Sequence, residues 1–220
     1  IDNLNGLYPK LIPIPYPKVG EKNPSCRVGI VRAQGGKTRW VPVPGDPRNH
    51  YIAYLNWTDD GEQVVLQQLN RLQNTNRLMV ANREGDAVET VLTDSDQAWV
   101  EEVKPLRWLE DGNRFLWLSE RDGWKHLYLA DRSGETFRLL TPGGYDVIEL
   151  NGLDEAAGQI YFTASPDNPT QRYLYSVPLE GGDAVRISPA DQAGVHSYQT
   201  SPDGKHADVP NRSRQGRTKR

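Results

Sequence analysis

The chain has 220 residues, a formal net charge of −3 and a single cysteine. Because acidic and basic residues are interspersed, the charge excludes an overall basic field for nucleic acid and a polybasic membrane-binding face. The lone Cys26 excludes an internal disulfide and a cysteine metal cluster. No apolar run reaches the roughly 20 residues that a membrane-spanning helix requires.

Short hydrophobic segments bounded by Gly, Asp or Asn recur along the chain, and each predicts a β-strand. The first two, 27–31 and 39–43, resemble the last two strands of a four-stranded unit. Helical spacing is nowhere kept over three turns, so helix is at most a minor component. Three complete sets follow, with strands predicted at 51–57, 63–69, 77–81 and 87–92, then at 99–103, 114–118, 126–130 and 136–140, and then at 147–150, 159–163, 172–177 and 184–187.

Two sets of turn glycines keep the same period. One set is spaced by 51, 46 and 46 residues and the other by 49, 49 and 48 residues. Since a period in this range with four short strands is typical of a β-propeller blade, the spacing predicts an all-β fold, with Gly61 and Gly112 at equivalent hairpin turns. The first set is Gly61, Gly112, Gly158 and Gly204, and the second is Gly36, Gly85, Gly134 and Gly182.

The length predicts a partial β-propeller of four-stranded antiparallel blades, with about four and a half blades present, because propellers usually have four to eight. A fourth copy begins at 196–205, but the hydrophobic strand expected after Gly204 is missing. We expect residues 1–206 to be part of a propeller domain and 207–220 to be an aberrant or disordered basic tail.

The repeated aromatic and titratable residues have structural interpretations. Trp57, Trp99 and Trp108 are expected to be core rings between adjacent sheets. The turn aspartates are expected to accept backbone N–H bonds, and the histidines to be hydrogen-bonded or exposed, since no pair has the spacing of a metal site. The turn aspartates are Asp60, Asp111 and Asp203, and the histidines are His50, His126, His196 and His206.

Several longer segments carry a resemblance to a known family. Tyr16-Pro17-Lys18-Val19-Gly20 precedes the first strands, and Leu69-Asn70-Arg71-Leu72-Gln73-Asn74 ends the second strand of the first complete set. Trp99-Val100-Glu101-Glu102-Val103-Lys104-Pro105 and Asp122-Gly123-Trp124-Lys125-His126-Leu127-Tyr128 follow in the next set. Over about residues 8–205 the sequence resembles the propeller domain of the dipeptidyl peptidase IV family, within the prolyl oligopeptidase family of serine peptidases, in its bacterial form.

The resemblance implies a two-domain parent protein. Its propeller would gate and position peptide substrates, and a C-terminal α/β-hydrolase domain would release Xaa-Pro or Xaa-Ala dipeptides. It further implies a periplasmic or secreted protein that uses no cofactor and that can form a homodimer. Since the Gly-x-Ser-x-Gly elbow of such a hydrolase does not occur in the sequence, we expect no catalytic residue in this chain and no peptidase activity from it alone.

Val103 and Lys104 are the candidate substrate-lining residues that the resemblance supplies. They match the Phe-Arg positions after Trp-Val that flank the extended substrate subsite in the mammalian enzyme. Lys in place of Arg loses a bidentate fork, and Val in place of Phe loses a stacking ring. Glu101 and Glu102 are not the family's amine-binding glutamate pair, which lies upstream of the Tyr-Pro-Lys segment.

A second function remains open at this point. The Asp-Gly turn repeats alone also allow a stand-alone propeller that binds proteins or glycans, because a fold does not specify a function. An ordinary exposed loop is likewise an alternative interpretation of Val103 and Lys104. Reading the coding sequence beyond Lys205 for a hydrolase elbow would discriminate between the two functions.

Overall fold

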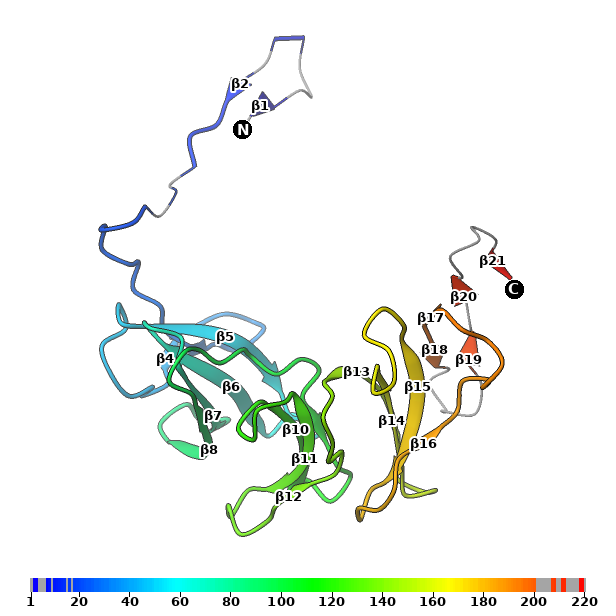
Figure 1. The fold of residues 1–220 in the computed structure, drawn as a ribbon. Helices are drawn as coiled ribbons and strands as arrows, with labels where there is room; N and C mark the ends of the chain where they lie inside the picture. The colour runs from blue at the N-terminus through cyan, green and yellow to red at the C-terminus, as the bar shows by residue number, and fades with distance from the viewer. Residues whose placement is uncertain are drawn as a thin grey trace.

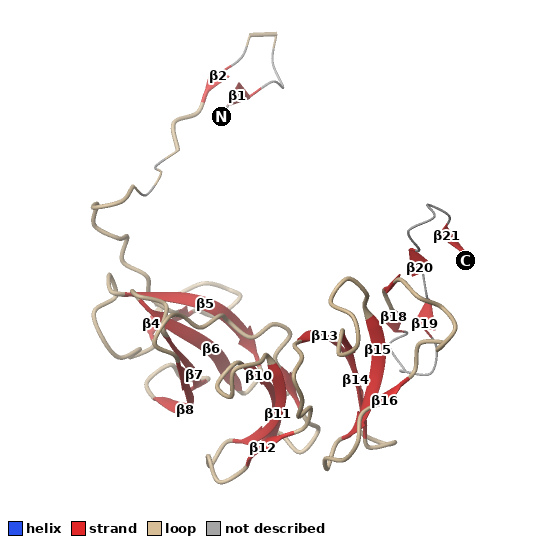
Figure 2. Ribbon diagram, in the orientation of Figure 1, coloured by secondary structure: helices blue, strands red, loops and turns tan. Residues whose placement is uncertain are grey.

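The computed structural model describes residues 2–3, 7–8, 10–14, 16, 18–200, 207–208, 211–212 and 218–219. These residues form strands, turns and loops, and no helix occurs among them (Figure 2). Accordingly, none of the described segments is a helix that could cross a membrane. β1 (Asp2–Asn3) pairs with β2 (Lys10–Leu11). β3 (Gly29–Ile30) pairs with β4 (Arg39–Trp40), and residues 28–41 around this pair are called the first hairpin and counted as the first sheet.

Three successive four-stranded antiparallel sheets follow, which confirms the three complete repeats. In each sheet the strands are paired in the order of the sequence, as the meander of a propeller blade requires. The second sheet has β5 (His50–Trp57), β6 (Gln63–Asn70), β7 (Thr75–Asn82) and β8 (Val88–Ser95), the third has β9 (Arg107–Trp108), β10 (Arg114–Ser119), β11 (His126–Asp131) and β12 (Phe137–Leu139), and the fourth has β13 (Val147–Asp154), β14 (Gln159–Ala164), β15 (Tyr173–Pro178) and β16 (Val185–Arg186).

The sheets stand side by side along an arc (Figure 1). The first strands β5 and β13 lie toward the concave side, and the last strands β8, β12 and β16 lie toward the convex side. This is the arrangement of blades around a propeller axis, with the innermost strand first in the sequence. In a complete propeller, this concave side would line the central channel.

Both faces of the second sheet are buried, which explains its nearly continuous hydrophobic strands. On β7, Leu78 and Val80 belong to the large core that runs through the third and fourth sheets. Met79 and Ala81, which point to the other face, pack with Val41 of the first hairpin in a second core. The second sheet thus supplies apolar side chains to the neighbour on either side.

The hairpin turns repeat as predicted. Gly61 and Gly112 have positive φ angles of 69° and 64°, and each N–H donates to the carbonyl three residues earlier. Asp60 accepts from the Glu62 N–H at 3.0 Å, and Asp111 accepts from the Arg114 N–H at 2.8 Å. The turn role of these two aspartates is confirmed, whereas Asp203 lies outside the described residues.

The strand predicted at 99–103 is wrong, because β9 is Arg107–Trp108 and residues 96–106 form a loop. Buried side chains of the second sheet bind the backbone of this loop in place of a neighbouring strand. Asn76 Nδ2 donates to the Glu101 carbonyl at 3.1 Å, and Gln67 binds both the N–H and the carbonyl of Val103. These bonds satisfy the Glu101 carbonyl and both backbone groups of Val103 without a sheet ladder.

The tryptophan prediction is wrong for two of three residues. Trp57 is 46% exposed and Trp99 is 63% exposed, because both stand at the edges of inter-blade grooves instead of between sheets. Trp108 is partly buried and packs against Phe115, with 4.7 Å between ring centroids. The fully buried indole of the core is Trp117.

The fourth repeat is described only in short pieces. These are β17 (Val195–His196), β18 (Gln199–Thr200), β19 (Ala207–Asp208), β20 (Asn211–Arg212) and β21 (Thr218–Lys219). Strand β18 pairs with β19, and β20 pairs with both β17 and β21. The prediction of a disordered basic tail over 207–220 falls mostly outside the described residues and stays a prediction.

An ion-pair bridge joins the third and fourth sheets. Glu180, in the turn after β15, accepts from Arg138 at 2.7 Å and from Arg114 at 3.0 Å. The bond from Arg138 lowers the pKa of the Glu180 carboxyl, burial opposes this effect, and the bond from Arg114 lowers the pKa further. The bridge therefore stabilises the folded state while the carboxylate is ionised.

We expect Glu180→Gln to lower the free energy of unfolding at pH 7 by less than about 1 kcal/mol, because the bridge is exposed and salt-screened. Because folding lowers the pKa of Glu180, the bridge contributes its full stabilisation above the unfolded-state pKa of about 4.3. This stabilisation is lost as the pH falls through the pKa of Glu180 in the folded state. Urea titrations of both proteins between pH 7 and pH 3 should therefore converge at the acidic end. The exposed Glu135→Gln is the control, and an equal loss in both variants would contradict the bridge.

Candidate functional site

Each of the described histidines makes at least one hydrogen bond through a ring nitrogen. His50 Nε2 donates to the Cys26 carbonyl at 3.1 Å, and Gln68 Nε2 donates to His50 Nδ1 at 3.0 Å. His126 Nδ1 lies 2.7 Å from Asp122, and His196 Nε2 lies 2.9 Å from the Gln192 carbonyl. His206 lies outside the described residues. No group of three metal-ligating side chains occurs in the part of the chain that the structure describes.

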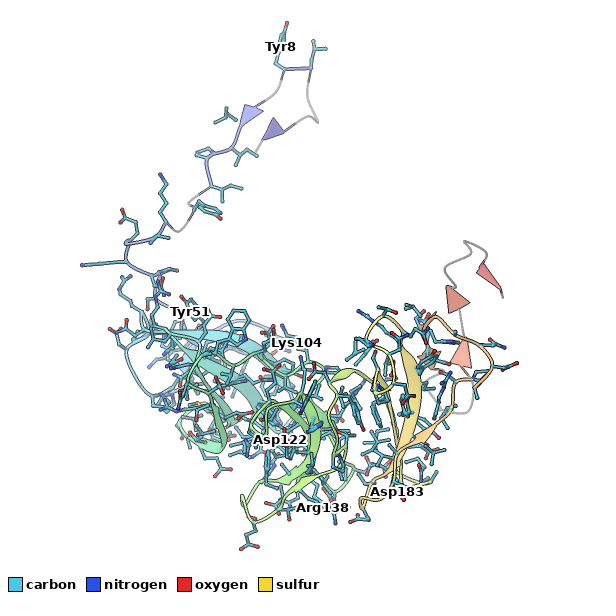
Figure 3. All side chains as sticks on the ribbon, in the orientation of Figure 1. Tyr8, Tyr51, Lys104, Asp122, Arg138 and Asp183 are labelled. Atoms are coloured by element: carbon cyan, nitrogen blue, oxygen red, sulfur yellow. The ribbon has the colours of Figure 1, made fainter. Side chains whose placement is uncertain are left out.

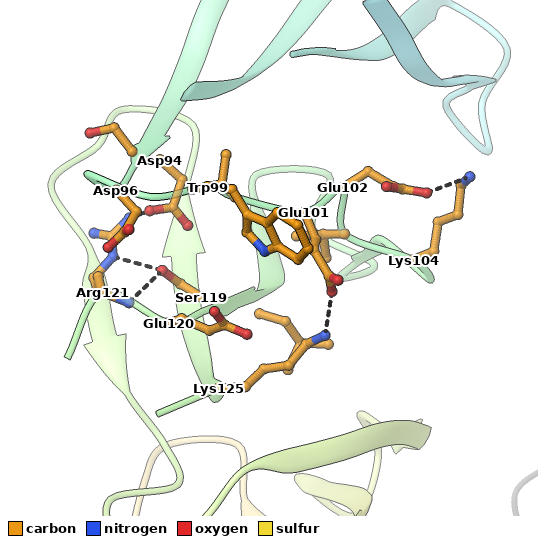
Figure 4. Close-up of a pocket in the computed structure, with 14 residues that line it drawn as sticks. Asp94, Asp96, Trp99, Glu101, Glu102, Lys104, Ser119, Glu120, Arg121 and Lys125 are labelled. Atoms are coloured by element: carbon orange, nitrogen blue, oxygen red, sulfur yellow. Dashed lines mark hydrogen bonds and ion pairs between the residues drawn. The ribbon is translucent and has the colours of Figure 1, made fainter. Parts of the chain in front are cut away.

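Val103 and Lys104 lie together at one pocket on the loop between the second and third sheets (Figure 4). The loop 96–106 forms one wall, and the turn between β10 and β11 forms the other. The pocket holds about 50 Å³, which is room for a few waters. Its lining residues are Asp94, Ser95, Asp96, Trp99, Val100, Glu101, Glu102, Val103, Lys104, Leu118, Ser119, Glu120, Arg121 and Lys125.

The two predicted residues differ in exposure. The Val103 side chain is buried and belongs to the main core, whereas Lys104 is exposed at the surface. Figure 3 shows Lys104 toward the concave side of the molecule, between the second sheet and the rest of the arc. Within the described residues, only the Lys104 side chain of this pair is available to a molecule in the channel.

Gln67 holds the loop in place from inside the second sheet. Its Nε2 donates to the Val103 carbonyl at 2.9 Å, and its Oε1 accepts from the Val103 N–H at 2.8 Å. The same Oε1 accepts from Asn76 Nδ2 at 2.9 Å, and Asn76 also binds the Glu101 carbonyl. Both side chains are buried, so the loop position is set by a rigid, water-excluded network.

Gln67 and Asn76 are functional residues that the sequence alone does not predict. The sequence does contain one signal for Gln67, which is the pair Gln67-Gln68 inside the apolar strand β6. A glutamine side chain buried in such a strand needs a hydrogen-bond partner. Gln68 turns to the opposite face and binds the Pro44 carbonyl and His50. The period-two alternation of a strand explains why only one of the two amides reaches the loop.

The cations of the pocket are each paired with a carboxylate. Lys104 Nζ lies 3.2 Å from Glu102, and Lys125 Nζ lies 3.1 Å from Glu101. Arg121 lies 3.1 Å from Asp94. The pairs fix the directions of the side chains around the opening, where Lys104 lies toward the concave side.

A buried polar cluster supports the back of the pocket. Trp117 Nε1 donates to Asp94 at 3.0 Å, and Asp94 also binds Arg121. Nearby, burial is the main cause that raises the pKa of the Tyr128 hydroxyl to about 12, and the charge and hydrogen bond of Asp122 add to it. Tyr128 therefore stays a neutral hydrogen-bond donor throughout the physiological range.

Comparison with known proteins relates this geometry to a family. A family model for the N-terminal region of dipeptidyl peptidase IV matches residues 2–210. The crystal structure of Porphyromonas gingivalis dipeptidyl peptidase 4 is similar, with a TM-score of 0.85 and 27% identity, covering 98% of this chain and 30% of that one.

Curated sequences lead to the same family. Dipeptidyl peptidase 4 of Trichophyton equinum is 27% identical over 179 residues, which cover 79% of this chain and 23% of the fungal protein. The enzyme of Arthroderma otae is 27% identical over 181 residues, with the same two shares. The chain thus spans about a quarter of the length of these relatives. Because the family model matches almost the whole chain, the chain belongs to the family of dipeptidyl peptidase IV N-terminal regions. It forms part of the β-propeller of such a region.

Proposed function

We propose that this chain is the substrate-positioning propeller part of a dipeptidyl peptidase that removes Xaa-Pro or Xaa-Ala dipeptides from peptides. Chemistry would come from an α/β-hydrolase domain of the longer protein, and this chain would guide the peptide. The observation that carries the proposal is the loop 96–106, which a buried network holds rigidly at the channel wall. A site needs such support to position a substrate.

Within the loop, Lys104 and Val103 have different roles. Val103 is the anchor, since its backbone is held by Gln67 and its side chain is buried in the core. Lys104 is the contact residue, because it is exposed and carries a charge into the channel. A peptide bound beside the loop would meet the ammonium of Lys104, with Glu102 at 3.2 Å limiting its movement.

The charge of Lys104 leads to a prediction on substrate preference. In the longer protein that carries this chain, we expect Lys104→Glu to lower kcat/KM for an Asp-Pro reporter relative to a Lys-Pro reporter. The expected change in the ratio is about fivefold to tenfold, because an exposed charge contact is worth up to about 1 kcal/mol and the reversal converts attraction into repulsion. Steady-state kinetics on both reporters measures the ratio.

Lys37→Glu is the matched control, since Lys37 is an exposed lysine on the first hairpin. It makes the same change in net charge away from the loop, so the ratio should stay at the wild-type value. Equal ratios in the two variants would show that Lys104 does not meet the substrate. Absence of any dipeptide release by the unmodified longer protein would contradict the proposed function itself.

A further inference from the structure

A second, larger groove lies between the second and third sheets. It is formed by the end of β5 and by the segment that leads into β9, and it holds about 530 Å³. This volume lies within the range of about 300–1,000 Å³ that ligand sites occupy. Its lining residues are Tyr54, Asn56, Trp57, Thr58, Asp59, Val65, Lys104, Pro105, Leu106, Arg107 and Trp108.

The floor of the groove is aromatic and rigid. Trp108 is held between Phe115, with 4.7 Å between ring centroids, and the guanidinium of Arg132, which lies 4.7 Å from the ring centre. Tyr54 packs against the main core beside the buried Val65. Trp57 stands at the rim with 46% of its surface exposed. An exposed indole beside a fixed aromatic floor is a stacking surface.

The groove also carries an unused positive charge. The side chain of Arg107 is exposed and makes no hydrogen bond or ion pair with any residue in the described ranges. Lys104 is paired with Glu102, so Arg107 is the free cation beside the stacking surface, with the Asp59 carboxylate farther along the lining. A guanidinium without a partner suits a carboxylate, which it can bind with two parallel bonds.

The backbone beside the groove favours a peptide. Among the described strands β5 pairs with β6 alone, so the N–H and C=O groups on its other edge have no strand partner. Lys104 lines both this groove and the smaller pocket of the loop, so the two lie beside the same side chain. A peptide that contacts Lys104 can therefore extend along the groove.

We propose that the groove binds an extended, proline-containing segment of the substrate, downstream of the dipeptide that is removed, with Arg107 holding a carboxylate of that segment. This inference rests on the proposed function. Proline rings stack on indole and phenol rings, and a polyproline II segment has free carbonyls and few N–H groups. The groove meets these needs with three aromatic rings, the free N–H groups of β5 and a guanidinium.

The test is direct binding to the longer protein. The probe is a fluorescein-labelled, N-acetylated proline-rich dodecapeptide with a free C-terminal carboxylate, which cannot lose an N-terminal dipeptide. We expect fluorescence anisotropy to show a Kd that rises at least about tenfold in Trp57→Ala and about fivefold in Arg107→Gln. With the C-terminally amidated peptide, the effect of Arg107→Gln should disappear while that of Trp57→Ala remains.

Matched controls separate binding from folding. Trp124→Ala removes an indole of nearly equal exposure, 44%, outside the groove, and Arg32→Gln removes an exposed guanidinium on the first hairpin. Both should bind like the wild type, and thermal melts should show that all variants fold. Equal Kd values for Trp57→Ala and Trp124→Ala would overturn the inference, as would displacement of the probe by a cello-oligosaccharide. Turnover of a Gly-Pro reporter by the wild type is measured separately, so failure of the proposed function is seen independently of the groove.

Discussion

Replacing Trp117 with alanine is expected to lower the free energy of unfolding by about 3–5 kcal/mol, as for other large core side chains. Trp117 is fully buried and lies edge-on to Phe115, with 6.3 Å between ring centroids. Its loss would leave a cavity in the core that the second, third and fourth sheets share. The change would also leave the buried carboxylate of Asp94 without its indole donor, which adds to the loss.

Urea denaturation of the chain, followed by circular dichroism, measures this effect. Trp117→Phe is the intermediate variant, because it keeps a six-membered aromatic ring and removes the N–H donor together with the pyrrole part of the indole. We expect it to cost about 1–2 kcal/mol. An alanine variant no less stable than the phenylalanine variant would contradict the central place of Trp117 in the core.

The second large effect concerns Gln67. Gln67→Leu would remove both bonds to the Val103 backbone, leaving its buried N–H and carbonyl without partners, and Asn76 would keep only its bond to the Glu101 carbonyl. Since each such group costs about 1–3 kcal/mol and neighbours do not add fully, we expect a loss of about 3 kcal/mol or more. The loop 96–106 would also lose its anchor, so the Lys104 contact should weaken.

Gln68→Leu is the control, because Gln68 is equally buried but binds Pro44 and His50 on the opposite face. Hydrogen exchange discriminates between the two variants. The Val103 amide should lose protection in Gln67→Leu and keep it in Gln68→Leu, after correction for global stability. Equal protection in both would show that Gln67 does not hold the loop.

The blades were predictable because their signals are local. Asp-Gly turns and the even spacing of Gly85 and Gly134 mark hairpins, and strands such as β10 are continuous apolar runs. The third sheet also shows the limit of such signals. Residues 99–103 have the composition of a strand, but long-range bonds from Gln67 and Asn76 draw them into a loop.

Exposure of the tryptophans could not be predicted for the same reason. Trp57 and Trp117 both lie in apolar strands, and only the packing of adjacent sheets decides which indole is buried and which reaches a groove. The candidate site was found partly through the resemblance, which supplied Val103 and Lys104. Gln67, the residue that positions them, lies in another repeat, and its partner is 36 residues away in the sequence.

The most direct test is a crystal structure of the longer protein with an uncleaved proline-containing peptide in its channel. We predict that the peptide contacts the loop 96–106, with a carbonyl or carboxylate oxygen within about 3.2 Å of Lys104 Nζ. Its downstream residues should follow β5 toward Trp57. A bound peptide that leaves the loop and Lys104 untouched would contradict the role of this propeller part in positioning the substrate.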